Sequence, residues 1–221
     1  MMNPMRPRIL FLAAARPMTS LFTAQPDARP YKSLPIQQKL DDMNPPPSAL
    51  KGREREAAIA SGFDAKKSEV HGMAQRGGAV TTHLRFGPKV FSPLIEPGAA
   101  DLLIAFEKME ALRFIHYLAP DGVAVVNAQE IPPAPVSSGQ ERYPERIEER
   151  LRDVTPRVHL LDALAAALAL HEVRAVNLVM TGAASHFLPL PEKAYLEALK
   201  SRLPARVVEA NAQAFRAGRA L

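Results

Sequence analysis

Residues 101–127, DLLIAFEKMEALRFIHYLAPDGVAVVN, decide the fold class. Residues 101–106 are almost entirely apolar, as strands buried on both faces of a parallel sheet are. In residues 107–118 apolar side chains recur at helical spacing, the APDG that follows is expected to end the helix, and residues 122–127 form a second apolar strand. A strand, a helix and a strand within about 27 residues predict a βαβ unit, and therefore an α/β fold with a right-handed parallel crossover.

A hairpin is expected before this unit. Residues 79–86 alternate between apolar and polar side chains, which is typical of a half-buried strand, and we expect His83 and Arg85 on its exposed face. After the turn GPK, residues 90–95 are predicted to return as a second strand, which Pro93 limits to an edge or an end of the sheet.

The chain beyond this unit is predicted to be mostly helical. Residues 131–143 are rich in Pro, Ser and Gly and are expected to form a surface loop, whereas residues 158–161 are a possible strand. Asp162 is placed to cap the helix that follows, and Gly62 to end a helix upstream. The predicted helices are residues 54–61, 144–152, 163–171, 175–184, 191–202 and 207–216.

The first 55 residues differ from the rest. They contain nine of the 21 prolines and no lasting periodicity, so we predict a Pro-rich, poorly ordered segment, residues 1–55, before a single domain, residues 56–221. The one apolar run, residues 9–15 (ILFLAAA), is compatible with a signal-peptide core, a transit peptide or a short buried strand. A disordered extension and a wrongly placed start of translation are further alternatives.

Composition excludes several classes of site. The chain has no cysteine, which excludes disulfides, a cysteine nucleophile and a thiolate-bound iron–sulfur cluster. The formal net charge of +5 belongs mostly to residues 1–56, so the rest of the chain is nearly neutral. With no tryptophan and an apolar stretch too short to span a membrane, we expect no nucleic-acid partner, no membrane and a cytoplasmic location.

Familiar catalytic motifs are missing from the sequence. The six histidines are scattered without metal-ligand spacing, and the chain has no G-x-S-x-G elbow, no P-loop and no G-x-G-x-x-G dinucleotide loop. The PDG at residues 120–122 is similar to part of the thiamine-diphosphate motif but lacks its first glycine. We therefore assign no catalytic residue and no metal ligand to this chain alone, and expect it to bind no cofactor by itself.

Residues 66–78, KKSEVHGMAQRGG, are hard to explain as part of a core, because they combine charge, imidazole, an amide and three glycines. Arg76 beside a glycine pair is suited to hold an anion, through its guanidinium and the exposed backbone N–H groups. The alternative is a solvated loop with an ordinary surface arginine, in which Glu69 pairs with a neighbouring lysine and His71 bonds to backbone. The candidate ligand or subunit-interface residues are Glu69, His71, Gly72, Gln75, Arg76, Gly77 and Gly78.

Four segments carry a family resemblance: SEVHGMAQRGGAV (68–80), RFGPKVFSPLI (85–95), ADLLIAFEKMEALR (100–113) and VVNAQEIPP (125–133). They resemble the gamma-type domain of the pyruvate/2-ketoisovalerate (2-oxoacid):ferredoxin oxidoreductases, and within that family the beta subunits of indolepyruvate oxidoreductases. The likeness extends from about residue 57 to the end of the chain.

The resemblance implies a Rossmann-like three-layer fold, with a sheet between helices on both faces and a helical C-terminal part. It also implies the small subunit of a two-subunit enzyme that oxidatively decarboxylates aryl 2-oxoacids such as indolepyruvate to acyl-CoA, with CoA as co-substrate, and reduces ferredoxin. Thiamine diphosphate and the iron–sulfur clusters are implied in the large (alpha) subunit. The absence of cysteine from this chain agrees with that division.

One feature of the family is not found in this sequence. Family members open with a strand and a G-x-G-G-Q-G loop, and residues 1–56 contain no such loop. We therefore expect the first strand and the Gly-rich loop to be missing or replaced. A non-catalytic assembly or regulatory module that keeps only the docking surface is the alternative function, and the missing dinucleotide loop disfavours a stand-alone NAD(P) dehydrogenase.

Overall fold

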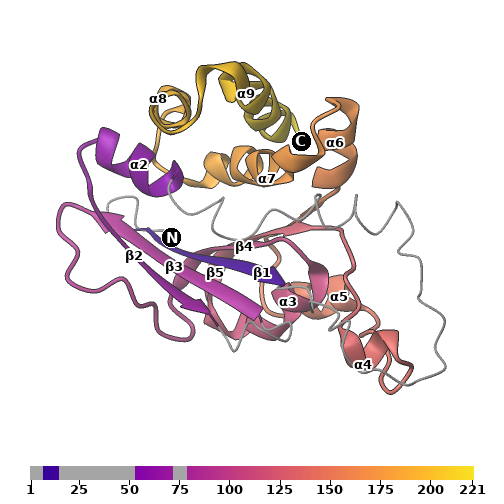
Figure 1. Cartoon of the computed structure of the whole chain (residues 1–221). Coiled ribbons are helices and arrows are strands. Elements are labelled where there is room, and N and C mark those ends of the chain that lie inside the picture. The colour runs from indigo at the N-terminus through magenta and orange to yellow at the C-terminus, as the bar shows by residue number, and fades with distance from the viewer. Residues whose placement is uncertain (1–6, 15–52, 72–78) are drawn as a thin grey trace, which may run out of the picture.

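The segment that decides the fold class forms two neighbouring parallel strands of a six-stranded sheet, in a computed structural model that describes residues 7–14, 53–71 and 79–221 (Figure 1). Strand β4 (Ala100–Ala105) is buried along its whole length, and β5 (Leu118–Asn127) lies parallel beside it. Helix α3 (Lys108–Phe114) and the 3-10 turn η3 (Ile115–Tyr117) connect the two strands. The predicted βαβ unit is confirmed.

The expected helix-ending turn at residues 119–122 is wrong, because these residues belong to β5. The ladder between β4 and β5 shifts its register between Ala100 and Leu102, so the irregular sequence is accommodated inside the strand. Gly122 fits this position for a steric reason: a Cβ there would lie 2.9 Å from the carbonyl oxygen of Ala100.

The strand order is β2-β3-β1-β4-β5-β6. Strand β1 (Arg8–Ala14) is parallel to β4 and antiparallel to β3 (Ala79–Gly87), and β2 (Asp64–His71) is antiparallel to β3 on its other side. Strand β6 (Val158–Leu161), which the sequence predicts, is parallel to β5 and forms the far edge. The described sheet is therefore mixed, and β3 runs against its five other strands.

Of the expectation that the first strand is missing or replaced, "missing" is wrong, because β1 occupies the middle of the sheet. The expectation for the Gly-rich loop stays a prediction, since residues 15–52 lie outside the described residues. Ile9 and Leu10 are fully buried on opposite faces, and the apolar run supplies the side chains that a central strand needs. Of the alternatives for residues 9–15, the buried strand holds for 9–14. Residues 1–6 and 15–52 lie outside the described residues, so the division at residue 55 stays a prediction.

Five helices lie on one face of the sheet, in an inner layer next to the strands and an outer layer that packs on the inner one (Figure 1). Helix α7 (Val176–Ala184) is buried at all nine positions and packs against α9 (Ala205–Ala220), and the apolar side chains of β1, β3 and β4 meet this layer. The other helices are α2 (Arg53–Ala60), α6 (Ala163–Ala169) and α8 (Glu192–Arg202), and the 3-10 turns η4 (Val173–Ala175) and η5 (Ser185–Phe187) flank α7. As predicted, Gly62 lies in the turn that ends α2, with φ of 84°, and Asp162 caps α6.

The opposite face is covered by α3 and α5 (Ile147–Arg152), and the short helix α4 (Ala134–Ser137) lies in the expected surface loop. Its core is made of Leu10, Leu103, Ala124 and Val126 from the strands. The Rossmann-like three-layer architecture with a helical C-terminal part is therefore confirmed.

Two expectations for residues 79–95 are wrong. Residues 90–95 do not form a strand, because β1 and β2 already occupy both edges of β3. His83 does not lie on an exposed face: its side chain is 6% exposed, and its Nδ1 accepts the backbone N–H of Ile95 at 3.1 Å. Residues 90–95 instead lie over one face of β3.

Candidate ligand and subunit-interface site

The carboxyl ends of four parallel strands meet at one edge of the sheet. Register pairs join Leu12 to Ala105 and Ala105 to Val126, so β1, β4 and β5 end at nearly the same level, and β6 is parallel to β5. In open α/β sheets, ligands bind beyond this edge at the point where neighbouring strands lead to helices on opposite faces. Strand β4 leads to α3 on one face, and α2, the first described helix after β1, lies on the other face.

The sequence SEVHGMAQRGG belongs to this edge. His71 pairs with Val80, and Ala79 pairs with Ala14 at the carboxyl end of β1, so residues 72–78 connect two strands there. The first part of the segment is strand rather than loop, since β2 extends to His71. Gly72, Gln75, Arg76, Gly77 and Gly78 lie outside the described residues, and their role stays a prediction.

Glu69 lies on β2 with its side chain mostly covered. Lys67 pairs with it at 3.4 Å between Nζ and Oε2, as the alternative interpretation of this glutamate expected. Its register partner is Thr82, on the face of the sheet that carries α2. Glu69 therefore has a structural partner close to the edge at which residues 72–78 lie, and for His71 the structure describes its backbone position in β2.

Glu107 lies at the same carboxyl edge and is a buried carboxylate that the sequence pattern does not single out. It is the second residue after β4 and is fully buried. It caps α3 by accepting the N–H of Glu110 at 2.8 Å, and it also accepts the N–H of Ile131 at 3.3 Å. The Tyr143 hydroxyl donates to the same carboxylate. Burial, followed by this bond to Glu107, raises the pKa of Tyr143 far above its usual range, so the phenol stays protonated. The buried carboxylate thus joins β4, α3 and the loop after β5.

Asn127 makes the corresponding links at the end of β5. Its Nδ2 donates to the carbonyl of Phe106 at 3.2 Å, and its Oδ1 accepts the N–H of Ala163 at 3.1 Å. Beside it, Lys108 pairs with Glu130 at the start of α3. Asn127 therefore ties β4, β5 and α6 together at the carboxyl edge. The sequence signal is a polar residue at or near the end of each buried strand, a pattern that also occurs in ordinary helix caps.

Glu110 lies next to this network with its side chain almost fully buried. Burial raises the pKa of the Glu110 carboxyl, an effect that Arg113 opposes and the charge of Glu107 reinforces. Arg113 contacts its Oε1 at 3.1 Å. Within residues 7–14, 53–71 and 79–221, no group of three or more His, Asp or Glu could hold a metal ion, and no helix is long and apolar enough to cross a membrane.

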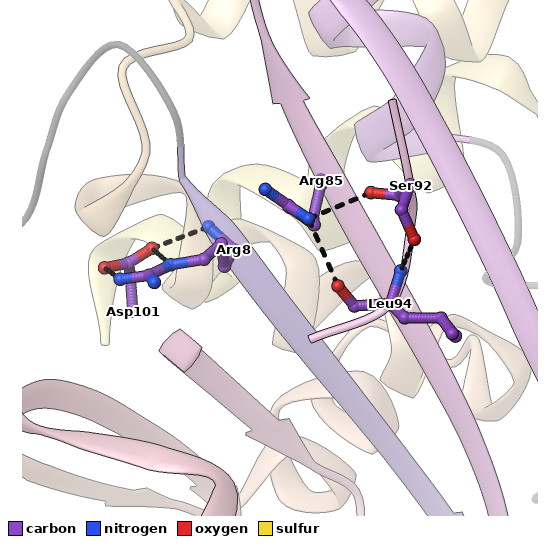
Figure 2. A network of polar contacts seen from close by, with 5 residues as sticks. All are labelled: Arg8, Arg85, Ser92, Leu94 and Asp101. Atoms are coloured by element: carbon purple, nitrogen blue, oxygen red, sulfur yellow. Dashed lines mark hydrogen bonds and ion pairs between the residues drawn. The ribbon is translucent and has the colours of Figure 1, made fainter. Parts of the chain in front are cut away.

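A second polar network lies at the amino end of β1, away from the candidate site (Figure 2). The Nε and Nη2 of Arg8 donate to the carboxylate of Asp101, both at 3.0 Å, and the backbone N–H of Arg8 donates to the same carboxylate at 2.7 Å. This bidentate pair joins the starts of the parallel strands β1 and β4. Arg85 of β3 instead donates to two carbonyl groups of the segment after its own strand, those of Ser92 and Leu94.

Comparison with known proteins identifies the family. Residues 55–221 match the family model described as "Pyruvate ferredoxin/flavodoxin oxidoreductase". The chain belongs to this family. It is 35% identical over 167 residues to the indolepyruvate oxidoreductase subunit IorB of Thermococcus kodakarensis, a match of 73% of this chain and 83% of that protein, and 37% identical over 166 residues to IorB of Archaeoglobus fulgidus, with 73% and 82% covered.

Solved structures show the same fold. The gamma subunit of the keto/oxoacid ferredoxin oxidoreductase of Geobacter sulfurreducens matches with a TM-score of 0.61 at 19% identity, covering 96% of this chain and 94% of that one. The 2-oxoglutarate:ferredoxin oxidoreductase of Magnetococcus marinus matches with a TM-score of 0.61 at 14% identity, covering 99% of this chain but 31% of that longer chain. The expected family and fold are both confirmed.

Proposed function

We propose that this chain is the small subunit of an indolepyruvate, or aryl 2-oxoacid, ferredoxin oxidoreductase that is active only with its large subunit. The reaction would be oxidative decarboxylation of the 2-oxoacid to acyl-CoA, with reduction of ferredoxin through the complex in the cytoplasm. The observation that carries the proposal is that SEVHGMAQRGG begins in the last residues of β2 and continues to the start of β3, two strand ends at the carboxyl edge of the parallel strands, in a chain 34–37% identical to four IorB subunits.

The cofactors of this reaction belong to the large subunit in this proposal. A chain without cysteine offers no thiolate for an iron–sulfur cluster, and the sequence lacks a complete thiamine-diphosphate motif. Thiamine diphosphate would supply the electron sink for decarboxylation when bound in the partner. This chain would contribute one wall of a shared site, in which Arg76 and the backbone of Gly77 and Gly78 hold a phosphate or carboxylate group of a reactant.

Co-expression with the large subunit tests the proposal. The purified complex is expected to reduce a viologen dye with indolepyruvate and CoA, and the small chain alone is expected to show no turnover. The assay measures dye reduction with and without each component. Turnover by the small chain alone, or a stable complex that turns over no 2-oxoacid, would contradict the proposal.

Arg76→Ala distinguishes the proposed role from a non-catalytic assembly module. If Arg76 binds a reactant, the complex stays intact and kcat/KM falls about 10- to 100-fold, the effect of losing one charge-assisted hydrogen bond. If the segment serves only docking, the variant loses the complex itself. Arg206→Ala, an exposed arginine on α9, is the control and is expected to change neither complex nor turnover.

A further inference from the structure

The face of the sheet that carries α3 and α5 is covered unevenly. Helix α3 packs against β1, β4 and β5, and α5 packs against β6. Over β3 on this face the described chain places residues 88–97, an irregular segment that follows the strand (Figure 1). In the part of the chain that the structure describes, this segment and the ring of Tyr117, which packs on His83, cover the β2–β3 side of the sheet, where the rest of the face has a helix.

This segment is held by three side chains from the strands. Asp64 of β2 accepts the N–H of Val90 at 2.9 Å, and His83 of β3 accepts the N–H of Ile95. Arg85 donates to the carbonyls of Ser92 at 3.1 Å and Leu94 at 3.2 Å (Figure 2). Val90 and Ile95, at the two ends, are buried. The backbone between them is therefore fixed from both ends and from the middle.

The fixed segment presents apolar side chains to solvent. Phe91 is 84% exposed and Leu94 is 55% exposed, and Lys89 lies over the Phe91 ring at 5.2 Å from its centroid. Exposed aromatic side chains on a preorganised backbone lose little conformational entropy when a partner covers them, which is the property of interface hot spots.

Positive charge surrounds these two side chains. Arg8, Arg85 and Lys66 are register partners in one row across β1, β3 and β2, and Lys89 follows in the segment. The carboxylates beside them are Asp101, paired with Arg8, and Asp64, paired with Lys66, and Glu96 lies at the end of the segment. Arg8 also faces a second carboxylate, Asp121. Next to Phe91 and Leu94 themselves, three cations (Lys66, Arg85 and Lys89) stand against two carboxylates (Asp64 and Glu96), and Arg85 bonds to uncharged carbonyl groups.

We infer that Phe91 and Leu94, with Lys66 and Lys89 at their rim, form the surface that docks the large subunit of the complex. The surface fits a partner that offers an apolar recess with an acidic rim. In the Magnetococcus marinus enzyme, the matching fold makes up 31% of a longer chain, so there the same domain is one part of a larger polypeptide. The inference rests on the proposed function, because it takes the large subunit as the partner.

A second copy of this chain is the less suitable occupant. A two-fold dimer places the same patch against itself, which would bring the excess positive charge of Lys66 and Lys89 of both copies together. Lysines on the edge strand β2 also oppose edge-to-edge pairing of two sheets.

Binding of the full-length chain to the immobilised large subunit tests the inference. Phe91→Ser is expected to raise Kd at least about 30-fold, and Leu94→Ser about 10-fold, the range of interface hot spots. Lys89→Glu is expected to slow association several-fold at low salt and to weaken its salt dependence. Leu168→Ser is the matched control, because Leu168 is 48% exposed on α6 at the opposite face, and it is expected to change Kd less than about threefold. Circular dichroism and thermal unfolding check that each variant folds.

Each outcome is decisive. The inference is overturned if Phe91→Ser binds with the wild-type Kd, or if the wild-type chain does not bind. It is also overturned if the wild-type chain self-associates and Phe91→Ser converts it to a monomer. Dye reduction measured on the same samples separates the inference from the proposed function. A complex that depends on Phe91 but turns over no 2-oxoacid supports the docking surface and contradicts the proposed oxidoreductase activity. Turnover by a complex whose formation does not depend on Phe91 supports the proposed activity and contradicts the docking surface.

Discussion

His83 lies in the middle of β3, and its buried imidazole links the strand to the segment that carries Phe91. Because Nδ1 accepts the N–H of Ile95, the ring is neutral with its proton on the other nitrogen, and Tyr117 packs edge-on at 5.6 Å between ring centroids. Protonation of Nδ1 would place two N–H groups against each other. One histidine thus holds the segment only in its neutral form.

The buried histidine predicts a pH dependence of stability. Burial lowers the pKa of His83 below its usual value of 6.5, so the unfolded chain takes up this proton at a pH where the folded chain does not. This contribution to stability is therefore complete above about pH 6.5 and is lost as the pH falls below it. In His83→Asn, whose side-chain oxygen can accept the same N–H, the Tm is expected to differ less between pH 7.5 and 5.5 than in the wild type.

His83→Phe is the control for this prediction. It removes the acceptor and leaves the buried N–H of Ile95 without a partner, which costs about 1–3 kcal/mol at any pH. An unchanged pH dependence in His83→Asn would assign the acid sensitivity to other groups, such as His159, whose pKa burial also lowers.

Single residues also show which parts of the candidate site can be predicted from the sequence. The irregular composition of residues 68–78 indicated a site, and strand pairing puts that segment at the carboxyl edge. Glu107 and Asn127 were missed because each stands at the end of an apolar run, where a polar residue is equally expected to cap a helix. Their buried hydrogen bonds depend on tertiary contacts between β4, β5 and the loop at Tyr143.

At the scale of elements, the sequence pattern predicts those helices and strands that depend on interactions between residues close together in the sequence. Strands β4 and β5, helix α3 and the C-terminal helices follow from apolar periodicity, and the caps at Asp162 and Gly62 follow from residue type. The predicted strand at residues 90–95 requires β3 to pair with the segment that follows it in the sequence. Its second neighbour is β1, which lies far away in the sequence, and no local signal specifies that partner.

The contact between α7 and α9 depends on two glycines that face each other's helix. A Cβ on Gly182 would lie 2.0 Å from the carbonyl oxygen of Phe215, and one on Gly218 would lie 1.9 Å from that of Val179. The helix axes can approach this closely only because neither position carries a side chain. Helix α9 thereby closes the core around Phe215 and Tyr195, whose rings stack at 5.0 Å between centroids.

Gly218→Ala is therefore expected to destabilise the chain although alanine favours a helix. The added methyl group meets backbone atoms, so one helix must move, which costs about 1–3 kcal/mol, or roughly 2–12 °C in Tm. Urea unfolding followed by circular dichroism measures the change. Gln213→Ala, at an exposed position of the same helix, is the control and is expected to stay within about 0.5 kcal/mol of the wild type. A change of less than about 0.5 kcal/mol in Gly218→Ala would mean that α7 and α9 can move apart at little cost in stability.

At the scale of the whole molecule, β1 joins two parts of the sheet. The hairpin β2–β3 lies on one side and the parallel strands β4–β6 on the other, so β1 supplies ladder partners to both. It also contributes to both cores, through Ile9 on the face of the five helices and Leu10 on the face of α3 and α5. The bidentate pair of Arg8 with Asp101 fixes its start. A strand in this position affects the candidate site and the docking surface together.

Ile9→Ala tests this role of β1 against Ile59→Ala, the same change at an exposed position of α2 that is 42% accessible. Ile9 is fully buried among side chains of β3 and β4, so its truncation is expected to cost about 2–5 kcal/mol, or roughly 4–20 °C in Tm. Ile59→Ala is expected to cost less than about 1 kcal/mol, because little surface is buried there. Thermal unfolding of the full-length chain measures both. Equal melting temperatures for the two variants would mean that the β2–β3 hairpin and the β4–β6 strands hold together without β1, and the central position of this strand would then be wrong.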